Sequence, residues 1–198
     1  MDRTPAAAVE RELLVSILDL TRGEAASRGD LLESMRITGE ALGFLLKKLI
    51  REGLLSERCG VIEAAPGQRL EMAVRAVRLG ADFERVCRAL GWLEFEEMVA
   101  HVFEENGYEV RRRFRFAAEG RRWEVDVVAS RRPHIFCAEC KRWSRGMGNG
   151  AALRMVEIHL EKARVFGENL AKVAMRLGLG GWRHAVVVPV AMSLTPPP

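Results

Sequence analysis

Apolar residues recur every three or four positions over the first third of the chain, a spacing that predicts amphipathic helices. We expect one helix that starts at Pro5 and ends before Gly23, and a third that follows Thr38 and stops at Gly53. Between them, Ser27 and Asp30 indicate the start of a second helix over residues 31–36. Two short extended segments then flank Cys59-Gly60, which predicts a two-stranded ribbon about a tight turn.

Three helices followed by a ribbon resemble a winged helix-turn-helix domain, and Arg51-Glu52-Gly53-Leu54-Leu55 is similar to that family's usual run into the wing. The resemblance covers about residues 8–63, and we assign residues 1–65 to this domain. It implies that the third helix enters the major groove of DNA and exposes Lys47 and Lys48. That face is poor in base-reading side chains, so a docking or dimerisation role stays open.

A helical linker, residues 66–90, leads into a larger domain at residues 91–198. The pattern in this domain predicts a helix, three strands, a long helix and a last strand buried on both faces. The expected ranges are 93–105 for the first helix, 108–116, 122–129 and 134–143 for the strands, an apolar helical stripe from Leu153 to Leu177, and 185–190 for the last strand. This order predicts an α/β (α+β) fold with a mixed sheet flanked by helices.

Composition narrows the class of protein. Of the 198 residues, 48% are hydrophobic and 29% are charged, which favours a folded globular protein over a disordered one. The longest apolar run, residues 185–192, is interrupted by Pro189 and is too short to span a bilayer, and the start lacks the pattern of a signal peptide. We therefore expect a cytoplasmic protein with reduced cysteines and no membrane contact.

Positive charge gathers on one segment of the chain. The net charge is only +4, but residues 109–145 hold ten arginines and Lys141 against four glutamates and Asp126. This pattern is typical of a surface that binds phosphates, although chance clustering in an arginine-rich chain is the alternative. The candidate nucleic-acid-binding residues are Arg111, Arg112, Arg113, Arg115, Arg121, Arg122, Arg142 and Arg145, together with Lys47 and Lys48.

Two carboxylates and a lysine interrupt strands that are otherwise apolar. Asp126 lies on one predicted strand, and Glu139 shares a face with Lys141 on the next. Because strands joined by a hairpin lie ~4.8 Å apart, the two carboxylates can approach one metal ion, and oxygen ligands suit Mg²⁺. Lys141 would lie beside that ion, able to orient or help deprotonate an attacking water and to offset charge on a phosphate.

Asp126 followed, after twelve intervening residues, by Glu139-Cys140-Lys141 resembles the core signature of the PD-(D/E)XK nuclease superfamily. The run Glu94-Phe95-Glu96-Glu97-Met98-Val99 is similar to the Phe-Glu motif of its Mrr-type and Holliday-junction-resolvase-like members. The resemblance covers residues 91 to about 190. It implies a restriction-endonuclease-like fold and a catalytic set of Glu96, Asp126, Glu139 and Lys141.

The resemblance also implies a cofactor and a substrate. Asp126, Glu139, Glu96 and the backbone carbonyl of Cys140 would hold one or two Mg²⁺ ions, for which Mn²⁺ substitutes. The activity implied is that of a metal-dependent endonuclease that hydrolyses double-stranded or branched DNA. Only four strands are visible, and nucleases of this fold often pair with a second subunit, so a homodimer is part of the expectation.

Helical spacing favours Glu96 over Glu97 as the helix residue of the site. Glu96 lies one turn before Val99 and two before Phe103, so it borders the buried stripe and points toward the sheet. Glu97 lines up with Glu104 on the outer face, and we keep it as the second choice.

Alternatives remain open. His134, Cys137 and Cys140 have a spacing that invites zinc, but a strand would send Cys137 and Cys140 to opposite faces. A catalytically silent DNA-binding or regulatory protein, which uses the nuclease-like fold as a platform, is the main functional alternative. An RNA-processing nuclease is the other.

Overall fold

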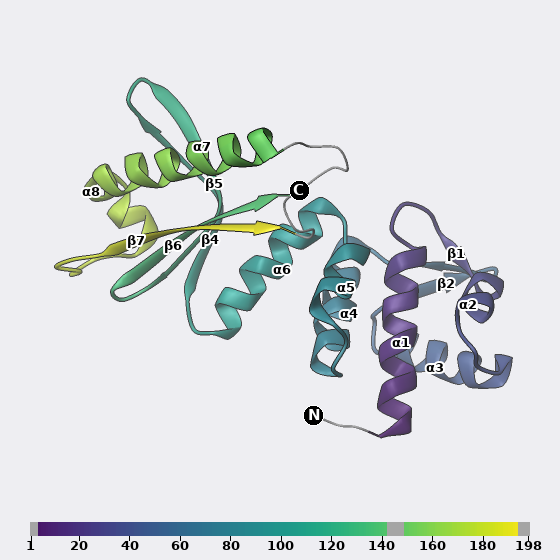
Figure 1. Ribbon diagram of the computed structural model, residues 1–198. Helices are drawn as coiled ribbons and strands as arrows, with labels where there is room; N and C mark the ends of the chain where they lie inside the picture. Colours follow the sequence, from purple (N-terminus) through teal and green to yellow (C-terminus); the bar gives the residue numbers. More distant parts are fainter. Residues whose placement is uncertain (1–3, 142–148, 194–198) are drawn as a thin grey trace. The chain divides into compact units, whose positions relative to one another are not determined.

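The structure, a computed structural model, describes residues 4–141 and 149–193 (Figure 1). The chain divides into two compact units, Met1–Phe95 and Glu96–Pro198, and each is described by itself. Among the helices in these ranges, none combines the length and the hydropathy that a bilayer-spanning segment requires.

The first unit consists of helices and one small antiparallel sheet. Its elements are α1 (Pro5–Leu20), β1 (Ala26–Ser27), α2 (Arg28–Ser34), α3 (Gly39–Arg51), β2 (Ser56–Arg58), β3 (Val61–Glu63), α4 (Pro66–Arg78) and α5 (Phe83–Ala89). The strand order is β1-β3-β2, so the predicted ribbon gains a third strand. Two residues are too few to show a periodic pattern, which is why β1 was not predicted. The winged-helix identity of this unit stays a prediction.

Helix α2 starts at the expected cap, Ser27 with Asp30, and its first residue is Arg28, three residues before the expected Leu31. Ser27 and Asp30 form a capping box, in which each side chain accepts a hydrogen bond from the other's backbone N–H at 3.2 and 2.7 Å. This reciprocal cap satisfies N–H groups that the first helical turn leaves free, so the helix starts directly at Arg28.

The second unit is a four-stranded mixed sheet flanked by helices, as the sequence predicts. Its elements are α6 (Trp92–Glu105), within which the division between the units falls, β4 (Glu109–Ala118), β5 (Arg121–Arg131), β6 (His134–Lys141), α7 (Asn149–Glu168), α8 (Leu170–Val173), the 3₁₀ helix η1 (Ala174–Leu177) and β7 (Val186–Ser193). The order is β4-β5-β6-β7, antiparallel except for the parallel pair β6–β7.

The hairpin between β4 and β5 turns on two residues, Glu119 and Gly120, with φ of 53° and 74°. Two consecutive positive φ values match the twist of the flanking strands, and glycine adopts them without a Cβ clash. On β4, buried Phe114 and Phe116 then alternate with exposed Arg115 and Ala117. The turn thereby fixes which side chains of β4 reach the core.

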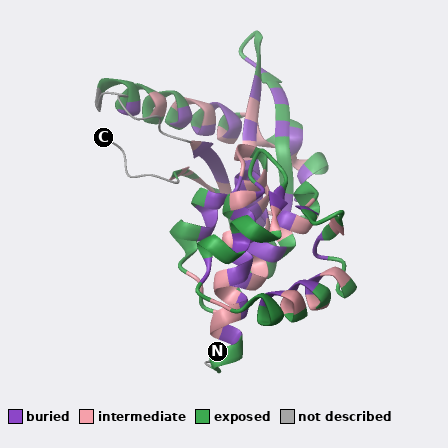
Figure 2. Ribbon diagram, turned by 90° about the vertical axis from the view of Figure 1, so that its right-hand side faces the viewer, coloured by how far each residue is buried: buried purple, intermediate pink, exposed green. Residues whose placement is uncertain are grey.

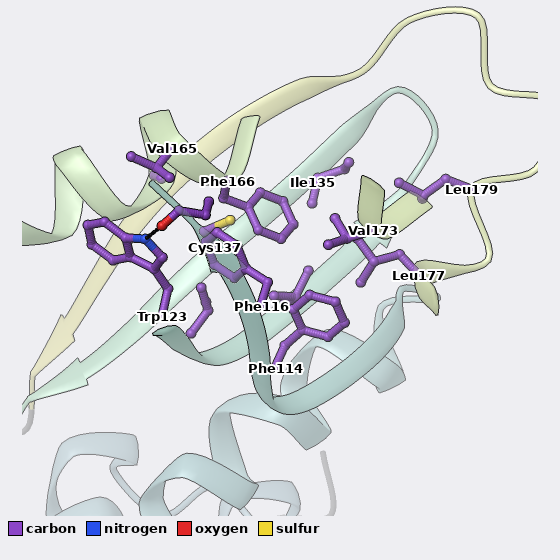
Figure 3. Packing of buried hydrophobic residues seen from close by; sticks show 14 residues of the cluster. Phe114, Phe116, Trp123, Ile135, Cys137, Val165, Phe166, Val173, Leu177 and Leu179 are labelled. Atoms are coloured by element: carbon purple, nitrogen blue, oxygen red, sulfur yellow. Dashed lines mark hydrogen bonds between the residues drawn. The ribbon is translucent and has the colours of Figure 1, made fainter. Parts of the chain in front are cut away.

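The core under α7 is built around Phe166 (Figure 3). Its ring meets those of Phe114 and Phe116 edge-on, at centroid distances of 6.1 and 5.4 Å. Cys137 of β6 and Val125 of β5 are fully buried in the same cluster. These contacts hold α7 against one face of the sheet.

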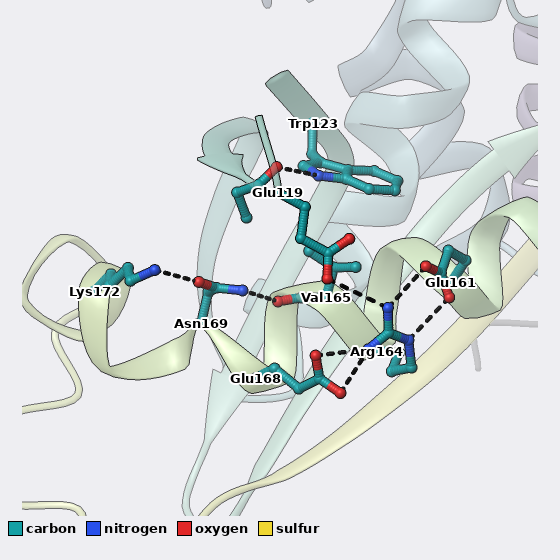
Figure 4. Close-up of polar contacts among 9 residues, drawn as sticks. Glu119, Trp123, Glu161, Arg164, Val165, Glu168, Asn169 and Lys172 are labelled. Atoms are coloured by element: carbon teal, nitrogen blue, oxygen red, sulfur yellow. Dashed lines mark hydrogen bonds and ion pairs between the residues drawn. The ribbon is translucent and has the colours of Figure 1, made fainter. Parts of the chain in front are cut away.

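The predicted long helix is interrupted, which corrects the sequence-based expectation. Helix α7 ends at Glu168, and α8 and η1 follow it. Both the backbone N–H and the side-chain amide of Asn169 donate to the carbonyl of Val165, at 3.1 and 2.9 Å, and Lys172 reaches the side-chain oxygen of Asn169 (Figure 4). Such a side chain competes with the helical hydrogen bonds, and the helix stops there.

The apolar stripe of α7 also differs from the expectation. Leu153, Val156 and Leu160 are exposed by 64, 39 and 50%, whereas Ala152 and His159 are buried. Of the predicted stripe, Ala163 is buried as expected, but the sheet-facing side of α7 includes polar residues, and the first three apolar positions lie on a neighbouring face.

Strand β7 is an edge strand, and the expectation that it is buried on both faces is wrong. Within the described residues it pairs with β6 alone, and Val186 is 48% exposed. Exposed and half-buried residues largely alternate along β7, and none is fully buried; Figure 2 colours the chain by burial. A run of valines is thus compatible with a half-exposed edge.

An ion network ties the outer side of α7 to the β4–β5 hairpin. Arg164 donates to Glu161 and Glu168 on its own helix, and reaches Glu119 of the turn at 3.4 Å (Figure 4). All four side chains are about half exposed, so this network adds little stability compared with the buried aromatic cluster.

We expect Phe166→Ala to lower the free energy of unfolding by about 3–5 kcal/mol, because it removes a buried ring that two other rings contact. Ile158→Ala, on the same helix but 53% exposed, should change it by less than about 0.5 kcal/mol. Urea denaturation followed by tryptophan fluorescence measures both. Equal effects of the two substitutions would contradict this account of the core.

Candidate active site

The register of the sheet brings Asp126 and Glu139 to neighbouring positions on β5 and β6. Val127 pairs with Ala138, so Asp126 and Glu139 come next in register. The ladder is not continued there, because the carboxylate of Asp126 accepts the backbone N–H of Cys140 at 2.8 Å. One carboxylate is thus fixed by the neighbouring strand's backbone, beside the other.

Glu139 is buried, with 7% of its surface exposed, and both of its oxygens are paired. Oε1 lies 2.8 Å from Nζ of Lys141, and Oε2 lies 2.5 Å from Nζ of Lys162. Lys141 comes from the same strand and Lys162 from α7. A buried carboxylate is costly unless it is paired, so this double pairing fixes the position of Glu139.

His159, one turn before Lys162 on α7, lies in the same cluster. Its Nε2 hydrogen-bonds the backbone carbonyl of Cys137 at 3.0 Å, and its Nδ1 faces Oε2 of Glu139 at 3.7 Å. Burial lowers the pKa of this imidazole although the charge of Glu139 opposes the shift. Burial thus favours the neutral ring, and His159 braces β6 by a hydrogen bond.

The environment shifts the pKa values of the two carboxylates in opposite directions. Burial raises the pKa of Asp126, and the charge of Glu139 adds to the rise, while the backbone N–H of Cys140 opposes it. Burial by itself would also raise the pKa of Glu139, but the hydrogen bonds from Lys141 and Lys162 outweigh it and lower the pKa. Glu139 is accordingly the ionised partner over the wider pH range.

Lys141 is held in its charged form. Burial alone would lower its pKa, but the hydrogen bond to Glu139 outweighs burial, and the pKa is raised. A lysine protonated at neutral pH donates hydrogen bonds and carries positive charge, and it is not a free base. Such an ammonium can donate hydrogen bonds and stabilise negative charge, but it cannot take up a proton.

Glu96 and Glu97 leave α6 in different directions. Glu96 is 8% exposed and pairs with Nε of Arg113 on β4 at 3.3 Å. Glu97 binds Arg112 at 2.6 Å, in a more exposed position. Arg113 comes opposite Asp126 in register, since Arg112 pairs with Val127. It has a positive φ of 46° and forms no ladder pair, so Glu96 meets β4 at an irregularity beside Asp126.

The donor set fits a hard divalent cation held by two carboxylates. Within residues 4–141 and 149–193, no three or more His, Cys, Asp or Glu side chains form a group that could hold a metal ion. Asp126 and Glu139 are adjacent oxygen donors, and the pKa of Asp126 is raised in part by the charge of Glu139. A cation relieves such repulsion, and the backbone carbonyl of Cys140 can add a third oxygen.

The structure disfavours the alternative of a zinc site at His134, Cys137 and Cys140. Cys137 and Cys140 lie on one strand, and Cys137 is buried in the core under α7. Burial raises the pKa of both thiols, whereas zinc binds thiolates. In the described part of the chain, neither cysteine joins His134 in a metal-binding group.

The predicted basic residues differ in how far carboxylates already neutralise them. Arg112, Arg113 and Arg115 pair with glutamates, and Lys48 pairs with Glu10 at 2.7 Å, which corrects its expected free exposure. Arg121 lies over the ring of Trp123 at 3.3 Å. Among the described residues, the exposed predicted residues without an ion pair to a carboxylate are Arg111, Arg122 and Lys47, while Arg142 and Arg145 lie outside the described residues.

Sequence reasoning missed Lys162 and His159. Both lie on α7, outside the two strands that carry the motif, and no motif spacing points to them. A signal existed nevertheless: polar residues three positions apart occupy the face of the helix that packs on the sheet. Polar side chains at such positions require buried partners.

Comparison with known proteins adds a family match. Residues 87–163 match the family model Mrr_cat, described as a restriction endonuclease. No curated protein matches the chain.

Two solved structures resemble the chain weakly. The "Protein of Unknown Function AF1548" is 19% identical with a TM-score of 0.30, over 52% of this chain and 50% of that one. Protein VC1899 from Vibrio cholerae is 17% identical with a TM-score of 0.33, over 97% of this chain and 42% of that one. The chain thus spans half or less of the length of these structures.

We expect Glu139→Gln to lower the pKa of Asp126, because it removes a neighbouring negative charge and leaves both lysines in place. Carboxyl-carbon NMR titration of Asp126 measures the shift. Glu168→Gln, at the exposed end of α7, serves as the control and should leave that pKa unchanged. An unchanged or raised pKa in the Glu139 variant would show that the two carboxylates do not interact.

Proposed function

We propose that this chain is a metal-dependent endonuclease that hydrolyses phosphodiester bonds of DNA, in keeping with the match of residues 87–163 to the restriction-endonuclease family model Mrr_cat. The observation that carries the proposal is the adjacency of Asp126 and Glu139 on neighbouring strands, with the ammonium of Lys141 2.8 Å from Glu139. Two acidic oxygen donors and a fixed cation are what stabilisation of a charged phosphoryl transition state requires.

Each residue has a distinct proposed role. Asp126, Glu139 and the backbone carbonyl of Cys140 would hold Mg²⁺, or Mn²⁺ in its place, and Glu96 is proposed as the third acidic residue. When bound, the ion supplies electrophilic stabilisation of the phosphoryl oxygens. Lys141, being protonated, donates hydrogen bonds that orient the attacking water and stabilise negative charge on the phosphate.

Lys162 is proposed as a positioning residue. It holds Oε2 of Glu139 while Lys141 holds Oε1, so the carboxylate keeps one orientation. His159 supports the same strand through the carbonyl of Cys137. Fixed side chains lower the cost of ordering the site when substrate binds.

The rest of the chain completes the proposal. We propose a winged helix at residues 1–65 that contacts DNA with Lys47, a linker at 66–90 and the nuclease domain at 91–198, in a cytoplasmic homodimer. Two copies would supply two sites, one for each strand of a duplex. Sedimentation velocity tests the dimer, and a monomer at micromolar concentration would contradict it.

We expect cleavage of end-labelled DNA in Mg²⁺ or Mn²⁺, and a loss of at least about 100-fold in rate for Asp126→Asn and for Lys141→Met, since each removes a group that acts on the reacting phosphate. Duplex, flap, four-way-junction, single-stranded and RNA substrates, each with a chelator control, identify the substrate. Glu168→Gln should retain full activity.

Two outcomes would overturn this function. Cleavage of RNA alone would support an RNA-processing nuclease. Equal retention of DNA by all variants, without cleavage and with chelator present, would support a catalytically silent DNA-binding protein. The pairing of Glu139 with two lysines is the observation that favours this second candidate, because a metal ion has to compete with them.

A further inference from the structure

A shallow groove of about 520 Å³ runs beside β4 and is lined almost wholly by arginines. Five arginines and one phenylalanine line it, and none of the described acidic residues does. The lining residues are Arg111, Arg112, Arg113, Phe114, Arg115 and Arg176. Arg176 comes from η1, 65 residues after Arg111, so the groove exists only in the folded unit.

Three of these arginines are already neutralised by glutamates. Arg112 binds both Glu97 and Glu104, at 2.6 and 2.8 Å. Arg113 pairs with Glu96 and Arg115 with Glu124. Their charges are balanced locally, so these residues shape the wall of the groove and contribute little net attraction for an anion.

Arg111 and Arg176 differ from the other three. Where the structure describes the chain, neither forms an ion pair with a carboxylate. Nε of Arg111 donates to the backbone carbonyl of Arg176 at 3.3 Å, and Nη2 of Arg176 donates to the carbonyl of Arg115 at 2.9 Å. The guanidinium of Arg176 also lies over the ring of Phe114 at 4.5 Å.

This bracing fixes two positive charges without cancelling them. Carbonyl groups and an aromatic face orient the guanidinium groups, whereas a carboxylate would also have neutralised them. Each guanidinium keeps N–H groups beyond those already used, and the planar fork matches the oxygens of a phosphate. Because the side chains are held in advance, less conformational entropy is lost when an anion binds.

We propose that Arg111 and Arg176 together bind one phosphate group of a nucleic-acid backbone. This inference rests on the proposed function, and the groove is connected to the candidate site, since Arg113 lines it and pairs with Glu96. The groove is open to solvent, so a phosphate of a nucleic-acid backbone can reach it.

The test is binding of a labelled DNA duplex in chelator, measured by fluorescence anisotropy over a series of salt concentrations. Arg111→Gln and Arg176→Gln should each weaken binding about tenfold, as loss of a charge-assisted contact does. The double variant should lose less than the product of the two, and its slope of log K against log salt should fall by about one, because both residues hold one phosphate.

Matched variants distinguish specific phosphate binding by Arg111 and Arg176 from a general effect of losing positive charge. Arg183→Gln removes one charge from an exposed position outside the groove and should weaken binding far less. The Arg111→Lys/Arg176→Lys variant keeps both charges but loses the forks, so its salt slope should stay while its affinity falls. Circular dichroism confirms that each variant is folded. An RNA duplex of the same sequence shows which backbone binds more tightly.

Each outcome decides the proposal. Three results would overturn the proposal that Arg111 and Arg176 bind one phosphate, while leaving the proposed nuclease in place. They are unchanged binding by the double variant, an equal loss of affinity in Arg183→Gln, and a fall in the salt slope of about two. If the unaltered protein binds neither DNA nor RNA, both the phosphate-binding proposal and the proposed function fail. Because chelator prevents metal-dependent cleavage, loss of catalysis alone leaves the result unaffected.

Discussion

The buried carboxylate of Glu139 is the constraint on which the second unit depends. Desolvating a carboxylate costs several kcal/mol, and partners with good geometry have to offset it. Lys141 supplies one partner from β6, but the other, Lys162, belongs to α7. Helix α7 therefore has to pack with this face toward the sheet, and Phe166, one turn later, enters the aromatic core as a result.

The same constraint gives the site its electrostatic character. Two adjacent carboxylates have pKa values displaced in opposite directions, Asp126 upward and Glu139 downward. Environments that separate the pKa values of neighbouring acids are typical of sites that handle charge in a reaction. Here the separation arises because the lysines approach Glu139, whereas a single backbone N–H approaches Asp126. Within the described residues, Asp126 thus keeps a hydrogen bond but no lysine or arginine partner, beside an acid that has two lysines.

Much of the fold was predictable because it depends on local sequence. Alternation and a two-residue turn define β4 and β5, and the mixed sheet is confirmed. One error comes from a local contact that the apolar period hides: the side chain of Asn169 bonds the carbonyl of Val165 one turn earlier, and α7 ends at Glu168, nine residues before the apolar period does at Leu177. The other error lies where nonlocal contacts decide. Strand β7 looks buried by composition, but its place at the edge of the sheet leaves one side without a neighbouring strand.

The residues of the candidate site also differ in whether local sequence or contacts between distant elements reveal them. The motif residues could be identified because they interrupt short apolar strands, where a charge needs a reason. Lys162, His159 and Arg176 could not, because each acts through a contact between elements far apart in the sequence. Yet the mismatch between the predicted apolar stripe and the sheet-facing side of α7 was itself informative. A helix whose polar residues face the sheet conflicts with simple packing, and such conflicts concentrate at functional sites. The positions where hydrophobic periodicity fails are therefore the ones to search first for partners of a buried charge.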